Sequence, residues 1–202
     1  ISQIIRSPGI YFRKEYGTTR KTAFYTATII SNKGLWTKFS LDEKNGSNGL
    51  EQIDLDRIYT RLNDFKLKTK SEKKDDSDDN KLYIYDLLKY FGLNYEEIYD
   101  SVKYPLHLSA HQLKRKENKN PNQSISLKEI PFEIKQLIFN QKSGGFSIGE
   151  IGRYKINKKL GLNLPKEITF LTAHDFIGII DGLIELRYYN RENDDIDHIK
   201  NK

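Results

Sequence analysis

The sequence of 202 residues contains no cysteine. This absence excludes disulfides, thiolate nucleophiles and zinc sites of the cysteine type. No run approaches the roughly 18 apolar residues that a membrane span needs, and the first residues carry no basic-then-apolar leader. Methionine is also absent, although every nascent chain begins with one. We therefore expect a soluble protein and an internal piece of a longer chain.

Charge of one sign is in excess. Lysine and arginine number 34 and aspartate and glutamate 28, which gives a formal net charge of +6. Such an excess favours an anionic partner, nucleic acid before others, although a surface of solvated lysines gives the same total. Hydrophobic residues make up 37% of the chain, which is enough for a core but on the lean side.

Alternating residue types predict a β-hairpin near the start of the chain. A β-branched and aromatic run at 23–30 precedes the turn residues "SNKG", and a second alternating run follows at 35–42. Its apolar face holds Leu35, Thr37, Phe39 and Leu41. The lone tryptophan, Trp36, falls on the polar face with Lys38 and Ser40. Further strands are predicted at "IYF", residues 10–12, and within 50–62.

Three short helices are predicted between residues 81 and 138. The first ends at Gly92 and presents one apolar face, formed by Leu82, Tyr85, Leu88 and Phe91. Asn94 and Glu97 form the capping pattern of the second. The third begins near Pro131 and turns inward Ile134, Leu137 and Ile138. Polar stretches within 43–80 and 110–147 are interpreted as loops or insertions.

Two longer helices are predicted toward the end of the chain. Ser147 and Glu150 form a capping pattern for one that ends at Gly161. Its inward residues are Ile148, Ile151 and Leu160, and its mostly outward residues are Arg153, Lys155, Lys158 and Lys159. Thr172 and Asp175 open the other, with an apolar stripe of Phe176, Ile179, Ile180, Leu183 and Ile184. The fold class is therefore predicted as α+β, with a hairpin-based mixed sheet and several packed helices.

The last residues gather oxygen and nitrogen ligands, but a catalytic motif is missing. Asp194, Asp195, Asp197 and His198 could hold a metal ion or form a solvated acidic turn, and adjacent residues rarely converge on one octahedral ion. The glycine-rich stretch "SGGFSIG" lacks the lysine and serine of a phosphate-binding loop. No serine lies in a nucleophile elbow. Arg6 precedes the rigid turn Ser7-Pro8-Gly9, which suits a guanidinium aimed at a ligand or an ordinary surface arginine equally.

Four stretches in order resemble the β subunit of bacterial-type multisubunit DNA-directed RNA polymerase. They are "SQIIRSPGIYF", "YTATIISNKGLWTKFSLD", "IGRYKINKKLGL" and "DDIDHIKNK". The resemblance implies the protrusion and lobe regions of that subunit. Residues 1–42 and 148–202 would then be protrusion-like segments that line the DNA channel, and 43–147 a lobe-like domain with polar insertions. The stretches "GLNYEEIYDSVKYP", "KINKKLGLNLP" and "DHIKNK" are similar to plastid-encoded forms, which implies a chloroplast location.

In this family the segment is noncatalytic, because the catalytic Mg²⁺ is held by aspartates of the β′ subunit. The resemblance implies no cofactor in this chain. It implies a complex with β′, α, other β-subunit regions and a sigma factor, together with template and non-template DNA and nascent RNA. The reaction implied is DNA-templated transcription of plastid genes, and no membrane is involved.

The resemblance also implies a pocket that reads the non-template strand just downstream of the catalytic centre. The matching residues are Arg6, Trp36, Ile196, Asp197 and Lys202. Lys202 stands where bacterial enzymes tend to have arginine, so its contact is expected to be less directional. Alternatively, protein covers Trp36, and Asp197 merely orders its own loop.

Other residues have weaker assignments. Gln3 matches a position beside the rifamycin pocket of bacterial enzymes. Arg153, Lys155 and Lys158 would contact phosphates or simply solvate a helix. Two rival functions stay open, a freestanding metal-dependent phosphoesterase that uses the terminal carboxylates and a small basic RNA-binding protein of ribosomal type.

Overall fold

The computed structural model describes residues 2–17, 23–42, 51–61, 81–109 and 145–201. The strands are β1 (Ser2–Ile5), β2 (Gly9–Tyr16), β3 (Ala23–Ile30), β4 (Thr37–Asp42), β5 (Ile58–Arg61), β6 (Lys81–Tyr83) and β7 (His198–Asn201). The α-helices are α1 (Ile84–Tyr90), α2 (Tyr95–Ser101), α4 (Gly149–Leu160) and α5 (Ala173–Tyr188). Two 3₁₀ turns are η1 (Leu55–Arg57) and η4 (Pro105–His107). Among the helices in these ranges, none has the length and apolar character needed to cross a membrane.

Five strands form one sheet in the order β2-β3-β4-β5-β6, with every neighbouring pair antiparallel. A single parallel bridge beside it joins Ile53 to Leu108 among the described residues. The predicted hairpin is confirmed, with β3 and β4 in register from Phe24 opposite Asp42 to Ile29 opposite Thr37. The α+β class is confirmed as well. The two predicted segments 1–42 and 43–147 contribute to the same sheet, and their division into separate units stays a prediction.

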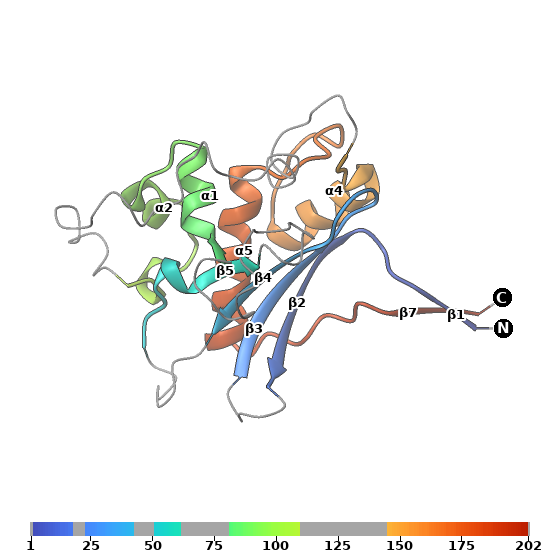
Figure 1. Cartoon of the computed structure of the whole chain (residues 1–202), viewed down its shortest axis with the longest axis horizontal. Coiled ribbons are helices and arrows are strands. Elements are labelled where there is room, and N and C mark those ends of the chain that lie inside the picture. Colours follow the sequence, from blue (N-terminus) through green and yellow to red (C-terminus); the bar gives the residue numbers. More distant parts are fainter. Residues whose placement is uncertain (1, 18–22, 43–50, 62–80, 110–144, 202) are drawn as a thin grey trace, which may run out of the picture.

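Helix α5 packs across the sheet and supplies the centre of the core (Figure 1). The predicted stripe is confirmed, because all five of its side chains are buried: Phe176, Ile179, Ile180, Leu183 and Ile184. Burying one such side chain stabilises the fold by about 1.5–3 kcal/mol. Phe176 meets Phe39 of β4 edge-on, with 5.8 Å between ring centroids. The capping box of Thr172 and Asp175 is formed and fixes where the helix begins.

Two local predictions need correction. Leu82 belongs to strand β6 instead of a helix, and α1 begins only at Ile84 because residues 81–83 pair with β5. Ser147 does not form a capping box with Glu150; its hydroxyl accepts from the N–H of Gly149. Helix α2 has the predicted Asn94 and Glu97 box, and α4 ends at Gly161 in the left-handed conformation, φ 67°. The helix predicted after Pro131 lies outside the described residues.

Strands β1 and β7 pair with each other and not with the five-stranded sheet. Their antiparallel register runs from Ser2 opposite Asn201 to Ile5 opposite His198. Figure 1 shows this two-stranded ribbon projecting away from the sheet and helices. The first and last described segments of the chain therefore enter and leave the folded body side by side.

Candidate nucleic-acid interface

Three residues far apart in the sequence meet where the β1–β7 ribbon joins the body. The Nε of Arg6 donates to Oδ1 of Asp197 at 2.6 Å. The guanidinium carbon of Arg6 lies 5.5 Å from the centroid of the Trp36 ring, within cation–π range. Arg6 follows β1, Trp36 precedes β4 and Asp197 precedes β7. We call these three residues the Arg6 cluster.

The Arg6 cluster is open to solvent. The side chains of Arg6 and Asp197 are 49% and 47% exposed, and Trp36 is 43% exposed. Trp36 is exposed, as the alternation predicts, although it lies just before β4 instead of within it, while Thr37, Phe39 and Leu41 are buried. Within the described part of the chain, the Nη groups of Arg6 make no hydrogen bond. The surface thus offers an aromatic face, hydrogen-bond donors and a carboxylate together.

Trp36 is held by a tight turn that docks on the segment before α4. The N–H groups of Asn32 and Lys33 both donate to the carbonyl of Ser147 at 2.9 Å. The N–H of Ser147 donates to the carbonyl of Lys33. Gly34 has φ +93°, and a Cβ there would lie 2.4 Å from the carbonyl oxygen of Gly145. Only glycine fits this turn without displacing the backbone.

Asp197 is positioned by residues that bind the outer edge of β2. The N–H of Asp194 donates to the carbonyl of Phe12 at 2.9 Å, and the N–H of Phe12 donates to the Asp194 carboxylate at 2.7 Å. One residue earlier, the Asn193 side chain accepts from the N–H of Lys14 at 2.6 Å. These contacts satisfy an edge that would otherwise be unpaired. They also fix the chain three residues before Asp197.

The ion pair raises the pKa of Arg6 above its ordinary value, first through the hydrogen bond that Arg6 donates to Asp197 and then through the charge of Asp197. Arg6 therefore stays cationic at any pH at which the fold survives. Because both partners are exposed, the pair contributes little to the free energy of folding. The ion pair therefore serves mainly to orient the two side chains.

The other site residues predicted in the first and last segments of the chain are Ile196, Gln3 and Lys202, and their assignments stay predictions. Ile196 is half-buried beside Asp197. Gln3 pairs with Lys200 in the backbone register of the ribbon, and its assignment stays a prediction. Lys202 lies outside the described residues.

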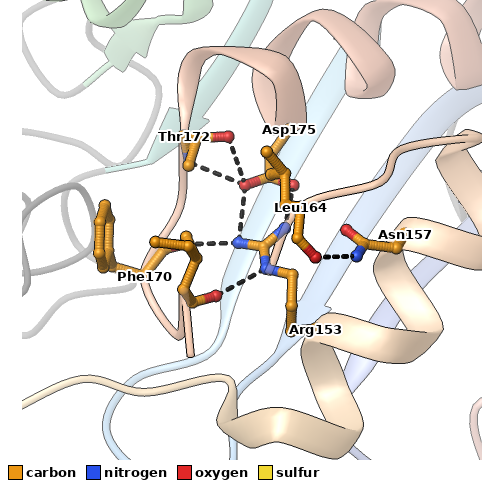
Figure 2. Close-up of polar contacts among 7 residues, drawn as sticks. Arg153, Asn157, Leu164, Phe170, Thr172 and Asp175 are labelled. Carbon is orange, nitrogen blue, oxygen red and sulfur yellow. Dashed lines mark hydrogen bonds and ion pairs between the residues drawn. The ribbon is translucent and has the colours of Figure 1, made fainter. Parts of the chain in front are cut away.

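The prediction that Arg153 faces outward from helix α4 is wrong. Instead of facing outward, its side chain is 0% exposed. Its Nη1 and Nη2 donate to the two carboxylate oxygens of Asp175 at 2.7 and 3.0 Å (Figure 2). Its Nε donates to the carbonyl of Ile168 at 2.7 Å, and Nη2 also donates to that of Phe170 at 2.6 Å. A guanidinium enclosed in this way cannot contact a DNA phosphate.

The buried position of Arg153 sets the rotation of α4. Gly152 and Ile156 lie on the same buried side, and Ile151, predicted to face inward, is 67% exposed. Lys155 and Lys158 are exposed as predicted. The ammonium of Lys155 donates to the hydroxyl of Ser7, next to Arg6.

Sequence patterns missed the contacts of Lys159 and of the acidic cluster. Lys159 is partly buried, and its ammonium lies 3.0 Å from the carboxylate of Asp194. Asp195 accepts from the N–H of Asp197 at 3.2 Å. Within the described residues, no three acidic or histidine side chains gather as a metal ion would require. Nothing in the local sequence distinguishes Asp194, which binds β2, from its neighbour Asp195.

Comparison with known proteins shows the family. The family model described as RNA polymerase Rpb2, domain 2, matches residues 64–202. The chain is 34% identical to the DNA-directed RNA polymerase subunit beta of Mesostigma viride and 34% identical to that of Pyropia yezoensis. It is 32% identical to the same subunit of Trichodesmium erythraeum (strain IMS101). These alignments cover 100% of the chain and 17%, 18% and 17% of the relatives.

The chain therefore spans less than a fifth of the length of these relatives. The relatives include plastid and cyanobacterial proteins, so they do not separate the two groups. The match over more than half of the chain agrees with the α+β architecture. The chain belongs to the RNA polymerase Rpb2 domain 2 family and is homologous to a segment of the β subunit of DNA-directed RNA polymerase.

Proposed function

We propose that this chain forms part of the wall of the DNA channel in a DNA-directed RNA polymerase that transcribes DNA into RNA. The Arg6 cluster, with Ile196 and Lys202, receives an unpaired base of the non-template strand just downstream of the catalytic centre. The segment itself is noncatalytic, and the chemistry belongs to Mg²⁺ on the β′ subunit. Its partners are β′, α, the rest of β, a sigma factor, template and non-template DNA and nascent RNA.

One observation carries the proposal: Arg6, Trp36 and Asp197 meet on an exposed surface although they come from three separate segments. An exposed indole is unfavourable in water, and a stacked base covers it with a gain of about 1–3 kcal/mol. Without a stacked base, Trp36 does not obtain this stabilisation. Stacking on Trp36 accepts any base, because every base has an aromatic face.

Base preference would come from Arg6 and Asp197. A carboxylate accepts from the amino groups of guanine or cytosine, and a guanidinium donates to base acceptors. Asp197 already accepts from Arg6, but a carboxylate has about four lone-pair sites and can accept from a base as well. The ion pair thus orients both groups before a base arrives.

Two finer points belong to the same proposal. Lys155 and Lys158 on the exposed side of α4 contact backbone phosphates, which adds a salt-dependent term that is independent of sequence. The enzyme is the plastid-encoded form, because the stretches "KINKKLGLNLP" and "DHIKNK" are similar to plastid β subunits.

The test uses polymerase reconstituted with the full-length β subunit that contains this segment. Transcription complexes carry each of the four bases at the downstream non-template position, and pause lifetimes are measured. Trp36→Ala is expected to reduce the difference between bases about tenfold, because a base that does not stack on Trp36 is not held against Arg6 and Asp197. Asp197→Ala is expected to reduce base dependence and to change which base gives the longest pause, because the carboxylate acceptor is lost.

Tyr16→Ala is the matched control, because Tyr16 is also an exposed aromatic residue, 66% exposed, at the opposite end of β2 from the Arg6 cluster. It is expected to keep the wild-type base dependence. Unaltered base dependence in both Trp36→Ala and Asp197→Ala would refute the proposed role.

A further inference from the structure

We infer that Lys159 and Asp194 are positioning residues for the Arg6 cluster: their ion pair fixes the chain that presents Asp197. We call this pair the Lys159 latch. The inference rests on the proposed function, because it explains how the proposed base contact keeps its geometry. It also reassigns a lysine of α4 from the helix surface to a contact inside the protein.

The ammonium of Lys159 has three partners. It lies 3.0 Å from Oδ2 of Asp194, donates to the carbonyl of Ile10 at 2.8 Å and sits 4.9 Å from the centroid of the Tyr11 ring. The side chains of Lys159 and Asp194 are only 25% and 22% exposed. Reduced exposure makes such a charge pair stronger than one at the open surface. This environment holds the ammonium in one place.

The same carboxylate joins Lys159 to β2. Oδ2 of Asp194 accepts from the N–H of Phe12 at 2.7 Å, so one oxygen serves both the strand and the lysine. Asp197 follows three residues later, and three residues span at most about 10 Å. If Asp194 leaves β2, Asp197 still lies opposite Arg6 at the end of the β1–β7 ribbon, but its attachment to the sheet is lost. The hydrogen bond from Arg6, at an exposed site, contributes too little to replace that attachment.

Helix α4 also holds the other half of the Arg6 cluster. Lys155 lies one turn before Lys159 on the same side of the helix, and its ammonium donates to the hydroxyl of Ser7. Ser7 follows Arg6 directly. The two lysines thus attach to the two chain segments that carry Arg6 and Asp197. Because Arg153 anchors α4 in the core, both attachments start from a fixed helix.

The experiment measures the Lys159 latch in the reconstituted polymerase with full-length β. The probe is 2-aminopurine at the downstream non-template position, whose fluorescence reports stacking, together with pause lifetimes for the four natural bases. Lys159→Met keeps the length of the side chain and removes the charge. It is expected to reduce base dependence about tenfold, as the loss of a charged hydrogen bond predicts, and to raise 2-aminopurine fluorescence. Lys159→Arg can still reach Asp194 and is expected to retain the wild-type signal.

The matched control is Lys166→Met. Lys166 also pairs with a carboxylate near α4, Glu150, at 3.4 Å, but both side chains are more than 60% exposed, at 65% and 61%. It is expected to leave base dependence unchanged. An equal loss in Lys166→Met would overturn the inference, because any lost surface charge would then have the same effect.

A double variant separates positioning from general weakening of the fold. If Lys159 acts through Asp197, Lys159→Met adds no further loss of base dependence to Asp197→Ala. A full additional loss in the double variant would overturn the inference. Should Lys159→Met fail to assemble into polymerase, Asp194→Asn decides the question, because it removes the charge and keeps an oxygen for the N–H of Phe12.

The failure of this inference differs from failure of the proposed function. If Trp36→Ala and Asp197→Ala lose base dependence while Lys159→Met and Asp194→Asn keep it, the latch is refuted and the base contact stands. If none of the four variants changes base dependence, the proposed function is refuted and the latch with it.

Discussion

Two arginine–aspartate pairs in this chain have nearly the same chemistry and opposite surroundings. In both, the shortest distance from a guanidinium nitrogen to a carboxylate oxygen is short, 2.7 Å for Arg153 and Asp175 and 2.6 Å for Arg6 and Asp197. The side chains of the first pair are 0% and 2% exposed, and those of the second are 49% and 47% exposed. Each pair joins segments that lie apart in the sequence. The difference is whether water, or a ligand, can reach the charges.

Burial determines what each pair can do. Arg153 and Asp175 are surrounded by partners, including the carbonyls of Ile168 and Phe170 and the N–H of Thr172, so neither charge is available to a ligand. The pair is strong only as part of that network. Arg6 and Asp197 gain little stability from each other but remain accessible. The first pair therefore holds α4 to α5, and the second suits recognition.

Breaking the buried pair should have the largest effect. Arg153→Met leaves the Asp175 carboxylate buried without its cation and deprives two carbonyls of their donor. We expect the free energy of unfolding of the chain to fall by about 3–5 kcal/mol. Urea denaturation followed by circular dichroism measures the change. A loss below about 1 kcal/mol, the value for a surface pair, would contradict the enclosed geometry.

The matched control for Arg153→Met is the double variant Arg153→Met with Asp175→Asn. Asparagine keeps an oxygen for the N–H of Thr172 and removes the uncompensated charge. The double variant should recover part of the lost stability, because a buried pair replaced on both sides costs less than one broken on a single side. If the double variant is the less stable of the two, isolated charge is not the reason for the loss.

The two pairs also show which features can be predicted from the sequence and which cannot. The box of Thr172 and Asp175 and the stripe of α5 depend on residues a few positions apart, so local pattern predicts them. The period of two also predicts that Trp36 is exposed, and it is exposed although β4 begins one residue later. Arg153 was placed on the wrong side of α4, since its partner is 22 residues away and a lone arginine in a helix usually faces water.

For the candidate site, pattern alone was insufficient. Nothing in residue spacing brings Arg6 to Asp197, whose separation is 191 residues. The resemblance to polymerase β subunits grouped these residues, and the structure brings three of them together. The contacts of Lys159 and Asp194 were missed by both routes, because they depend on how α4 and the end of the chain meet at the edge of β2. The family itself was predicted correctly.

A third carboxylate can be compared with those of the two pairs, because it accepts a hydrogen bond from a backbone N–H and not from an arginine. Asp181 lies on α5 and accepts from the N–H of Lys103 at 2.9 Å. Burial raises its pKa to about 6, opposed by that hydrogen bond and aided by the charge of Glu185. The folded state therefore holds the proton more tightly than the unfolded state, whose carboxyl has a pKa of 3.8. The stability contributed by Asp181 is lost as the pH rises from about 4 to about 6.

Asp181→Asn removes this pH dependence and keeps an oxygen for Lys103. Well below pH 3.8 the variant and wild type should be equally stable, because Asp181 is then protonated in both the folded and the unfolded state. Above pH 6 the variant should be more stable by at most about 1 kcal/mol, since solvent screens a carboxylate that is only partly buried. Urea midpoints at pH 4 and pH 7.5 give the comparison. Equal differences at the two pH values would contradict the raised pKa.

Removing the exposed pair should have the smallest effect on stability. Arg6→Ala takes away one exposed ion pair and a cation–π contact at 5.5 Å from Trp36, so the free energy of unfolding should change by less than about 1 kcal/mol. In a polymerase with full-length β, the same variant should nevertheless weaken the base dependence of pausing. A small change in the free energy of unfolding together with weaker base dependence is what an accessible pair predicts. Replacing a residue that matters mainly for folding would lower the free energy of unfolding first. A fall of about 3 kcal/mol or more in Arg6→Ala would make the two pairs equivalent and remove the physical basis for assigning one to structure and the other to recognition.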